Sequence, residues 1–266
     1  MRKANLMSRF GLAFMLCLSC VANAPAALKT KVVTYKHGDL ECRGYLAWDD
    51  AVEGLRPGVL VVHEWWGLNE YSRQRAEQLA KLGYIAFAAD IYGEGKTVQH
   101  PMDAGKMAAQ VRANVDDWRK RAQAALDVLK SQPQCDTGKL AAIGYCFGGS
   151  TALQLAYTGA DLKAVVSFHG ALPTATTDEA KRVKAHVLVC HGGADSFIPE
   201  DAIKSFRTAL DQAKVKYDFV AYPGVRHSFT VPDADSHGIE GLKYDKKADE
   251  DSWKRMQSLF KDKLGK

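Results

Sequence analysis

The sequence predicts an α/β fold in which a mostly parallel, doubly wound sheet carries helices on both faces. Short apolar runs, of the kind buried on both faces of a parallel sheet, alternate along the chain with segments that have helical spacing. The chain is 266 residues long, 47% hydrophobic and 25% charged, which is typical of a globular protein with ample material for a core. No linker-like stretch divides it, so we expect residues 27–266 to form one domain.

The expected elements follow from local patterns. Residues 32–35 and 40–47 are expected to pair as a β-hairpin. The strands that follow are expected at residues 58–63, 85–89, 139–143, 164–168, 186–190 and 217–222, and those at 58–63, 85–89, 164–168 and 186–190 read as buried. The expected helices are residues 71–82, ending at the C′ glycine Gly83, one long helix with Val111 to Leu129 on its apolar face, residues 148–157, a helix opened by Pro199, and a last helix burying Trp253, Met256, Leu259 and Phe260. Ligands in such folds bind beyond the carboxyl ends of the strands.

Residues 1–26 have the pattern of an export signal. Basic residues precede an uncharged apolar run, residues 10–22, which is short for a bilayer span. Small residues offer two cleavage sites, and we favour the one after Ala26 because the other leaves Pro25 next to the cut. An uncleaved anchor and a lipid-modified Cys20 are the alternatives. Export predicts a periplasmic or secreted protein that is free of the membrane after cleavage.

The charge balance points away from polyanionic partners. The full chain has 36 Lys and Arg against 31 Asp and Glu, a net charge of +5. Three of these cations, Arg2, Lys3 and Arg9, lie in the predicted signal, so the remainder carries 33 against 31, or +2. No run of Lys or Arg is present, and both nucleic acids and anionic lipids select clustered positive charge. We therefore expect a small-molecule partner, and nothing in the sequence indicates an oligomeric state.

Four cysteines follow the predicted signal: Cys42, Cys135, Cys146 and Cys190. In an oxidising compartment, at most one disulfide can form among these four cysteines if one of them is to remain a reactive thiol. We expect the pair to be Cys42 with Cys135, because their flanking segments look like loops or strand edges.

The sharpest signal is the segment Gly-Tyr-Cys-Phe-Gly-Gly at residues 144–149, directly between an expected strand and an expected helix. A Gly-x-nucleophile-x-Gly elbow needs this placement, because its glycines let strand and helix pack closely around a nucleophile on a sharp turn. A thiol has an ordinary pKa of about 8.5, and a helix N-terminus with a basic partner favours the thiolate. We predict that Cys146 is a catalytic nucleophile; the alternative is a buried cysteine in a glycine-rich turn.

An acid and then a base are expected later in the chain. Asp195 follows the strand at 186–190 and His227 follows the strand at 217–222, so both stand at strand carboxyl ends, on the side of Cys146. Taken alone, a loop aspartate is more often a helix cap and a lone histidine more often incidental. In this order, the three residues predict a Cys-His-Asp triad.

The strand at 58–63 ends in His-Glu-Trp-Trp-Gly, residues 63–67. In α/β-hydrolases, one oxyanion donor is the backbone N–H after the nucleophile and the other comes from the loop after this strand. The candidates are the N–H groups of Phe147 and Trp65. Gly67 stands where an H-E-x-x-H zinc motif needs its second histidine, so we predict no metal site and no cofactor.

Together these segments resemble the dienelactone hydrolase family of α/β-hydrolases. The likeness covers residues 30–264 and rests on the segments 63–67, 90–93 (Asp-Ile-Tyr-Gly), 144–149, 191–195 (His-Gly-Gly-Ala-Asp) and 227–229 (His-Ser-Phe). The resemblance implies an α/β-hydrolase fold and hydrolysis of an enol-lactone that carries a carboxylate, a carboxymethylenebutenolidase-like activity. It also implies that Glu64 accepts the Cys146 proton when substrate arrives, leaving a thiolate paired with protonated His227.

The sequence departs from the family pattern where the substrate carboxylate would bind. Family members hold it with one Arg shortly after the Asp-x-Tyr segment and another a few positions after the catalytic His, and these places hold Glu94 and Val231 here. Arg226 lies nearby in the sequence and is a candidate substrate contact, although it can equally point to solvent. An apolar wall for an acyl or aryl group is expected from Tyr92, Trp65 and Trp66, with a core position as the alternative for each.

We expect a hydrolase that cleaves a small carboxylic ester or lactone through an acyl-thioester on Cys146, with His227 moving protons and Asp195 fixing the imidazole. Two alternatives stay open: an exported hydrolase-like protein that binds a ligand without turnover, and a thioesterase or peptidase that uses the same triad. Three segments that follow strand ends are expected to shape substrate choice, residues 93–109, 171–183 and 230–251.

Overall fold

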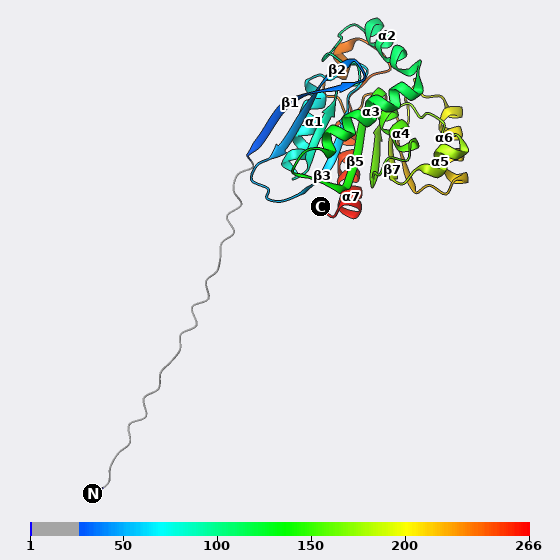
Figure 1. The fold of residues 1–266 in the computed structure, drawn as a ribbon. Helices are drawn as coiled ribbons and strands as arrows, with labels where there is room; N and C mark the ends of the chain where they lie inside the picture. The colour runs from blue at the N-terminus through cyan, green and yellow to red at the C-terminus, as the bar shows by residue number, and fades with distance from the viewer. Residues whose placement is uncertain (2–26) are drawn as a thin grey trace.

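The computed structural model describes Met1 and residues 27–266, and the predicted signal with its cleavage site lies outside these residues apart from Met1 (Figure 1). Its strands are β1 (Leu28–His37), β2 (Leu40–Asp49), β3 (Arg56–Val62), β4 (Ile85–Ala89), β5 (Cys135–Tyr145), β6 (Ala164–Phe168), β7 (His186–Gly192) and β8 (Tyr217–Tyr222). They form one sheet in the order β1-β2-β4-β3-β5-β6-β7-β8. Only the β1-β2 hairpin and its junction with β4 are antiparallel. The predicted mostly parallel sheet is confirmed.

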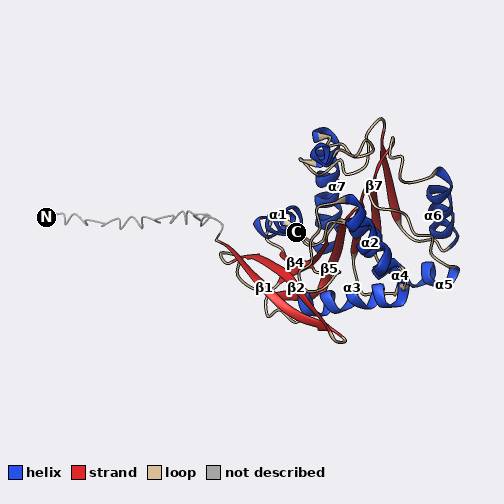
Figure 2. Ribbon diagram, turned by 90° about the horizontal axis from the view of Figure 1, so that it is seen from above, coloured by secondary structure: helices blue, strands red, loops and turns tan. Residues whose placement is uncertain are grey.

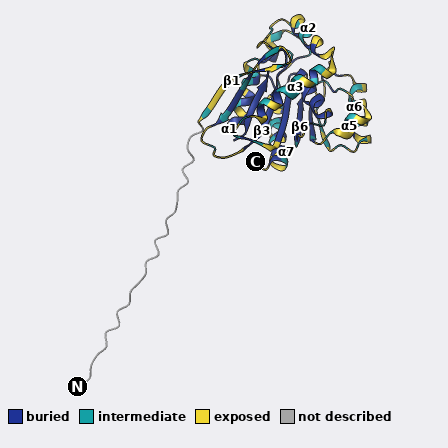
Figure 3. Ribbon diagram, in the orientation of Figure 1, coloured by how far each residue is buried: buried dark blue, intermediate teal, exposed yellow. Residues whose placement is uncertain are grey.

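The helices cover both faces of this sheet (Figure 2). They are α1 (Glu70–Lys81), α2 (Pro101–Arg112), α3 (Val115–Lys130), α4 (Phe147–Tyr157), α5 (Thr177–Arg182), α6 (Glu200–Gln212) and α7 (Lys246–Leu264), with a short 3-10 helix η1 (Ala234–His237). Leu60 and Val62 of β3 pack into the core beneath α3, α4 and α6, whereas Val59 and Val61 pack into the core beneath α1 and α7. This alternation follows from the two-residue period of a strand. The central strands β3, β4 and β6 are buried along their whole length, whereas β1 at the edge of the sheet is largely exposed (Figure 3).

Two expected helix boundaries are wrong. The long helix predicted through Val111 to Leu129 is two helices, because Asn114 caps α3 by accepting a hydrogen bond from the Asp117 N–H at 3.0 Å. Val111 therefore belongs to α2, whose last residue is Arg112. Pro199 is the N-cap of α6 rather than its first helical residue.

The predicted disulfide between Cys42 and Cys135 is wrong, because both thiols are free. Cys42 precedes Arg43, whose backbone N–H donates to Asp90 just beyond the carboxyl end of β4. Cys135 pairs with Arg56 at the first residue of β3. The two cysteines thus lie at opposite ends of the parallel strands, a placement that their neighbouring sequences do not reveal.

The parallel strands bring the candidate site residues to one edge. Val62 pairs with Gly144, so β3 and β5 end side by side, and Gly192 pairs with Tyr222, so β7 and β8 do the same. The loops that follow these four strands carry Glu64, Cys146, Asp195 and His227. Among residues 27–266, no helix is both long and apolar enough to cross a membrane.

Candidate active site

Cys146 stands at the sharp turn between β5 and α4. Its backbone has a φ of 53° and a ψ of −115°, a positive-φ conformation that is strained for a residue with a side chain. The elbow glycines make the turn possible: a Cβ on Gly144 would overlap the Gly148 carbonyl, and a Cβ on Gly148 would overlap the Val62 carbonyl. Strand and helix therefore approach closely, and Cys146 lines a cavity beyond the sheet edge.

The predicted acid and base contact one another. His227 Nδ1 lies 2.7 Å from Asp195 Oδ2, and the two side chains are 6% and 0% exposed. Burial lowers the pKa of His227, but attraction to the Cys146 thiolate and the hydrogen bond with Asp195 outweigh burial and raise this pKa to about 10. The imidazole is thus stabilised in its protonated form, the form that pairs with a thiolate.

Cys146 and His227 face one apolar cavity of about 180 Å³. Its wall is formed by Trp65, Arg112, Cys146, Ala171, Phe197, Ile198, His227 and Leu242. Ala171 and Leu242 come from two of the three segments that were expected to shape the site, and Arg112 comes from the end of α2. Cys146 and His227 thus meet at a surface where a small ligand can reach both side chains.

Two backbone N–H groups are available as oxyanion donors. Phe147 is the first residue of α4, where a helical N–H has no intrahelical acceptor, and within residues 27–266 neither its N–H nor that of Trp65 donates a hydrogen bond. The Phe147 ring itself is buried between Trp118 and His63, with centroids 5.5 Å and 5.9 Å away. This packing fixes the start of α4 and so the direction of the Phe147 N–H.

Glu64 is buried at the edge of the same site. Its Oε1 accepts a hydrogen bond from Ser228 Oγ at 3.0 Å, so its side chain contacts the residue next to His227. Burial raises the pKa of Glu64 to about 7, although His227 and Ser228 both act in the opposite direction. A carboxyl group with this pKa changes its protonation state near neutral pH and suits proton exchange at the site.

The three remaining sequence predictions need correction. Trp66 does not line the cavity, because its ring is 3% exposed and stacks on His237 at 4.2 Å. Tyr92 is also buried, and its hydroxyl donates to the Trp65 carbonyl at 2.8 Å, so it supports the Trp65 loop instead of forming the wall. Arg226 donates to the Glu240 carbonyl at 2.8 Å and is absent from the wall.

Arg112 is the site residue that the sequence did not indicate. Its guanidinium lies 5.2 Å from the centre of the Phe147 ring, and it has no carboxylate partner among the described residues. A second cavity of about 380 Å³, reaching to Trp118 and Pro199, shares Arg112 and Phe197 with the first. The two cavities adjoin one another, and the Arg112 guanidinium lies where they meet. Among residues 27–266, no three His, Cys, Asp or Glu side chains gather to hold a metal ion.

The family model described as the dienelactone hydrolase family matches residues 42–264. The chain belongs to this family. A solved dienelactone hydrolase-like promiscuous phosphotriesterase from metagenomic libraries is 41% identical to it, with a TM-score of 0.87, and the match covers 90% of this chain and 99% of that one. The family match and this structural similarity confirm the predicted family and the α/β-hydrolase fold.

Two curated relatives match the chain at about 30% identity. A Methylorubrum extorquens protein provisionally named carboxymethylenebutenolidase is 29% identical over 261 residues, with 91% of this chain and 87% of that protein covered. An Escherichia coli protein with the same provisional name is 30% identical over 225 residues, covering 80% of each. The family is one of hydrolases, so the chain is a dienelactone hydrolase-like hydrolase.

Proposed function

We propose that this protein hydrolyses small carboxylic esters or lactones through an acyl-thioester on Cys146. The observation that carries the proposal is the position of His227: its ring faces the cavity that Cys146 lines, while Asp195 holds its Nδ1 from behind. Nε2 is therefore left to exchange protons with the reacting groups. This is the arrangement that a nucleophile, a base and an orienting acid require.

In the acylation step, the Cys146 sulfur forms a bond to the substrate carbonyl carbon, and the carbonyl π electrons move to its oxygen. The N–H groups of Phe147 and Trp65 stabilise this oxyanion, and loss of one such donor typically costs about 2.7–4 kcal/mol. The oxyanion then collapses, the bond to the alkoxy oxygen breaks, and that oxygen takes the proton from His227 Nε2. The products are the alcohol and an acyl-thioester.

In the deacylation step, His227 is neutral and removes a proton from a water molecule that attacks the thioester carbonyl. The second oxyanion collapses with cleavage of the C–S bond, which releases the acid and returns the Cys146 thiolate beside protonated His227. For a lactone, the alcohol and the acyl group stay joined through both steps, so the product is a single hydroxy acid. Glu64, whose pKa is raised to about 7, accepts a proton from the thiol in molecules that rest in the neutral form.

The cavity supports a substrate with a small apolar acyl group and an anionic substituent. Its wall near Cys146 is built mainly from apolar side chains, and Arg112 supplies a guanidinium in addition to the protonated His227. Arg112 reaches the site from α2, so it occupies neither of the family positions that hold Glu94 and Val231 here. It can pair with a carboxylate on the substrate.

Hydrolysis of four compounds tests the proposal: an activated aryl ester, a lactone, an acyl-thioester and a peptide. We expect the first two to be cleaved, with a burst of one aryl alcohol per protein and a mass increase on Cys146 in acid-quenched samples. Turnover without any adduct on Cys146 would contradict the covalent route. Ligand binding without turnover of any compound would favour a binding protein.

Phosphotriester hydrolysis is a second candidate activity. A relative 41% identical to this chain is described as a promiscuous phosphotriesterase. The Cys146 thiolate could attack phosphorus and expel an aryl alcohol as it does at a carbonyl carbon. An aryl phosphotriester therefore belongs in the same assay, with Cys146→Ala as the control.

A further inference from the structure

We propose that Tyr71 and Arg75 of α1 are positioning residues for His227, acting through Thr230 in the loop that carries this histidine. The inference rests on the proposed function, because it concerns how the catalytic imidazole is held. Neither residue lines the cavity, and both lie behind the loop. Their role is to fix the loop from the side opposite to the substrate.

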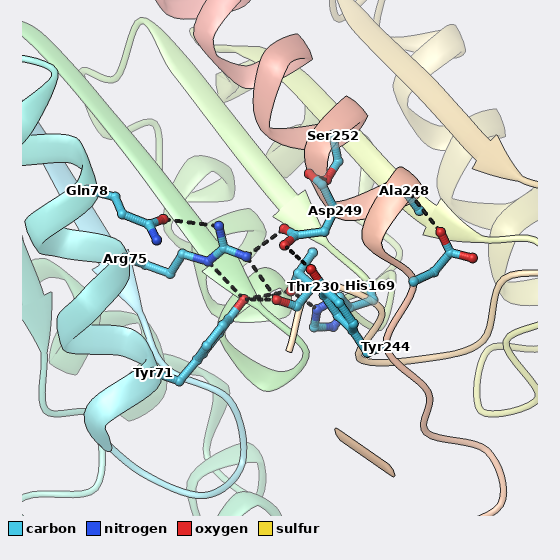
Figure 4. A network of polar contacts seen from close by, with 10 residues as sticks. Tyr71, Arg75, Gln78, His169, Thr230, Tyr244, Ala248, Asp249 and Ser252 are labelled. Atoms are coloured by element: carbon cyan, nitrogen blue, oxygen red, sulfur yellow. Dashed lines mark hydrogen bonds and ion pairs between the residues drawn. The ribbon is translucent and has the colours of Figure 1, made fainter. Parts of the chain in front are cut away.

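The contacts form a continuous polar network (Figure 4). Arg75 donates from Nη2 to the Thr230 carbonyl at 2.8 Å and from Nε to Tyr71 Oη at 3.1 Å. Tyr71 Oη lies 3.1 Å from the same Thr230 carbonyl and 2.6 Å from Thr230 Oγ1. Thr230 is thus held at both its backbone and its side chain by two residues of one helix.

The hydroxyl of Thr230 continues the network toward the catalytic histidine. Thr230 Oγ1 lies 2.7 Å from His169 Nε2, and the His169 ring packs edge-on against the His227 ring, with centroids 5.2 Å apart. His169 is fully buried, and burial and the nearby cations keep its pKa well below the ordinary value, so the ring is neutral. The neutral His169 ring packs against the His227 imidazole without placing a second positive charge beside it.

The loop contains a strained residue between His227 and Thr230, so contacts on both sides of that residue bear on its geometry. On the N-terminal side of Ser228, the backbone of His227 makes two hydrogen bonds. Its N–H donates to the Gly241 carbonyl at 3.1 Å, and its carbonyl accepts from the Lys243 N–H at 3.0 Å. The next residue, Ser228, has a φ of +53°, which is strained for a residue with a side chain. On the other side of this strained position, the network at Thr230 adds side-chain contacts to the backbone hydrogen bond that the Phe229 carbonyl accepts from the Asp245 N–H at 3.0 Å. Together the two attachments determine where the His227 ring lies.

Arg75 is an unusual residue to bury, which supports a geometric role. Its side chain is 8% exposed, and it pairs with Asp249 of α7 at 2.5 Å. Its guanidinium also lies over the rings of Tyr71, Tyr145 and Trp253 at 5.1–5.5 Å. A buried ion pair is often no more stable than apolar residues of the same volume, whereas a guanidinium fork fixes several acceptors at once. Here the fixed acceptors include the Thr230 carbonyl.

Three substitutions separate the parts of the network. Tyr71→Phe removes one hydroxyl and keeps the ring, Thr230→Val removes the link to His169 and keeps the backbone carbonyl, and Arg75→Lys keeps the charge without the fork. The matched control is Arg73→Gln, since Arg73 lies two residues away on α1 and packs over Tyr45 instead of the loop. Each protein is assayed on an activated aryl ester well below its melting temperature.

We expect kcat to fall roughly 10-fold or more in Tyr71→Phe and Thr230→Val, with KM unchanged, because a displacement of 1 Å in catalytic geometry can cost about 100-fold. Proton NMR supplies a second readout: the low-field resonance of the His227 Nδ1–H bonded to Asp195, identified by its loss in Asp195→Asn, should shift in both variants. Arg75→Lys should show an intermediate effect and Arg73→Gln none.

A lower melting temperature with unchanged kcat and an unchanged resonance would overturn the inference, because the network would then stabilise the fold alone. A change confined to KM would overturn it as well. If the wild-type protein cleaves none of the compounds, the resonance still decides: a shift in Tyr71→Phe supports the positioning role although the proposed function fails, and no shift refutes it.

Discussion

Asp195 is held between His227 and Phe197. One carboxylate oxygen lies 2.7 Å from His227 Nδ1, and the other accepts the Phe197 backbone N–H at 2.9 Å. The Phe197 ring in turn packs edge-on against the His227 ring with centroids 5.2 Å apart, although 48% of the Phe197 residue is exposed. The carboxylate therefore fixes both the base and an aromatic residue of the cavity wall.

Substitution of Asp195 by Asn should disable the base without unfolding the protein. The amide can present an N–H where the carboxylate accepted one, so His227 would be left in the wrong tautomer, and we expect kcat to fall about 10³- to 10⁴-fold, as for other triads. Asp218→Asn is the matched control, because Asp218 pairs with His186 at 2.8 Å on an exposed face. Comparable losses in the two variants would argue against a special role for Asp195.

Replacement of Cys146 by Ala should abolish ester turnover and leave the fold intact, because the strained backbone at this position tolerates a methyl group at least as well as a thiol. Circular dichroism checks the fold, and iodoacetamide labelling with peptide mapping checks the thiol. We expect Cys146 to react much faster than Cys190, which is buried and whose pKa burial raises to about 12. Turnover that survives in Cys146→Ala would refute the nucleophile.

Replacement of Glu64 by Gln should stabilise the protein at alkaline pH. Burial raises the pKa of Glu64 from its ordinary 4.5 to about 7, so the folded state binds this proton more tightly than the unfolded chain. Its contribution to stability is complete below pH 4.5 and is lost as the pH rises toward 7. At pH 8.5 we expect Glu64→Gln to exceed the wild type by up to about 3 kcal/mol in the free energy of unfolding.

Urea denaturation at pH 4.5 and pH 8.5 measures this difference, which should be small at the lower pH. The same substitution tests the catalytic role, because Gln keeps an acceptor for Ser228 but cannot take up a proton. We expect the rise of kcat/KM through about pH 7 to disappear in Glu64→Gln. An unchanged pH profile would mean that another group receives the thiol proton.

Replacement of Arg112 by Gln should weaken binding of anionic esters and leave neutral esters of the same size unaffected. We expect KM for a carboxylate-bearing aryl ester to rise roughly 10-fold or more, since hydrogen bonds to charged groups are worth about 1.5–3 kcal/mol. Arg226→Gln is the control, because Arg226 binds the Glu240 carbonyl outside the cavity wall. An equal change in KM for both esters would show that Arg112 contributes shape and not charge.

Most of the sheet could be predicted from the sequence, because its strands depend on short-range patterns. The strands at 85–89, 164–168 and 217–222 have the predicted bounds. The first two are buried on both faces and therefore read as short, mainly apolar runs, whereas β8 is a partly exposed edge strand. Cys146, Asp195 and His227 could be placed at one edge because parallel strands end together. The family confirmed by comparison agrees with the segments quoted for the resemblance.

The cavity wall could not be predicted, because it depends on how loops and helix ends pack. Trp66 follows a strand as an apolar wall residue would, yet it stacks on His237, which is distant in the sequence. Arg112 sits within an apparently continuous helical pattern, and nothing in that pattern marks it as a site residue. Only the break before α3 could have indicated it, through the capping side chain of Asn114.

This break has a consequence for substrate choice. Helix α2 ends at Arg112 and helix α3 begins at Val115. The direction of the Arg112 guanidinium is therefore set by the two linking residues, the second of which is the N-cap Asn114. A single substitution at that cap could extend one helix into the other and carry the guanidinium away from the nucleophile. Selectivity for charged compounds would then change while every group that performs the chemistry stayed in place.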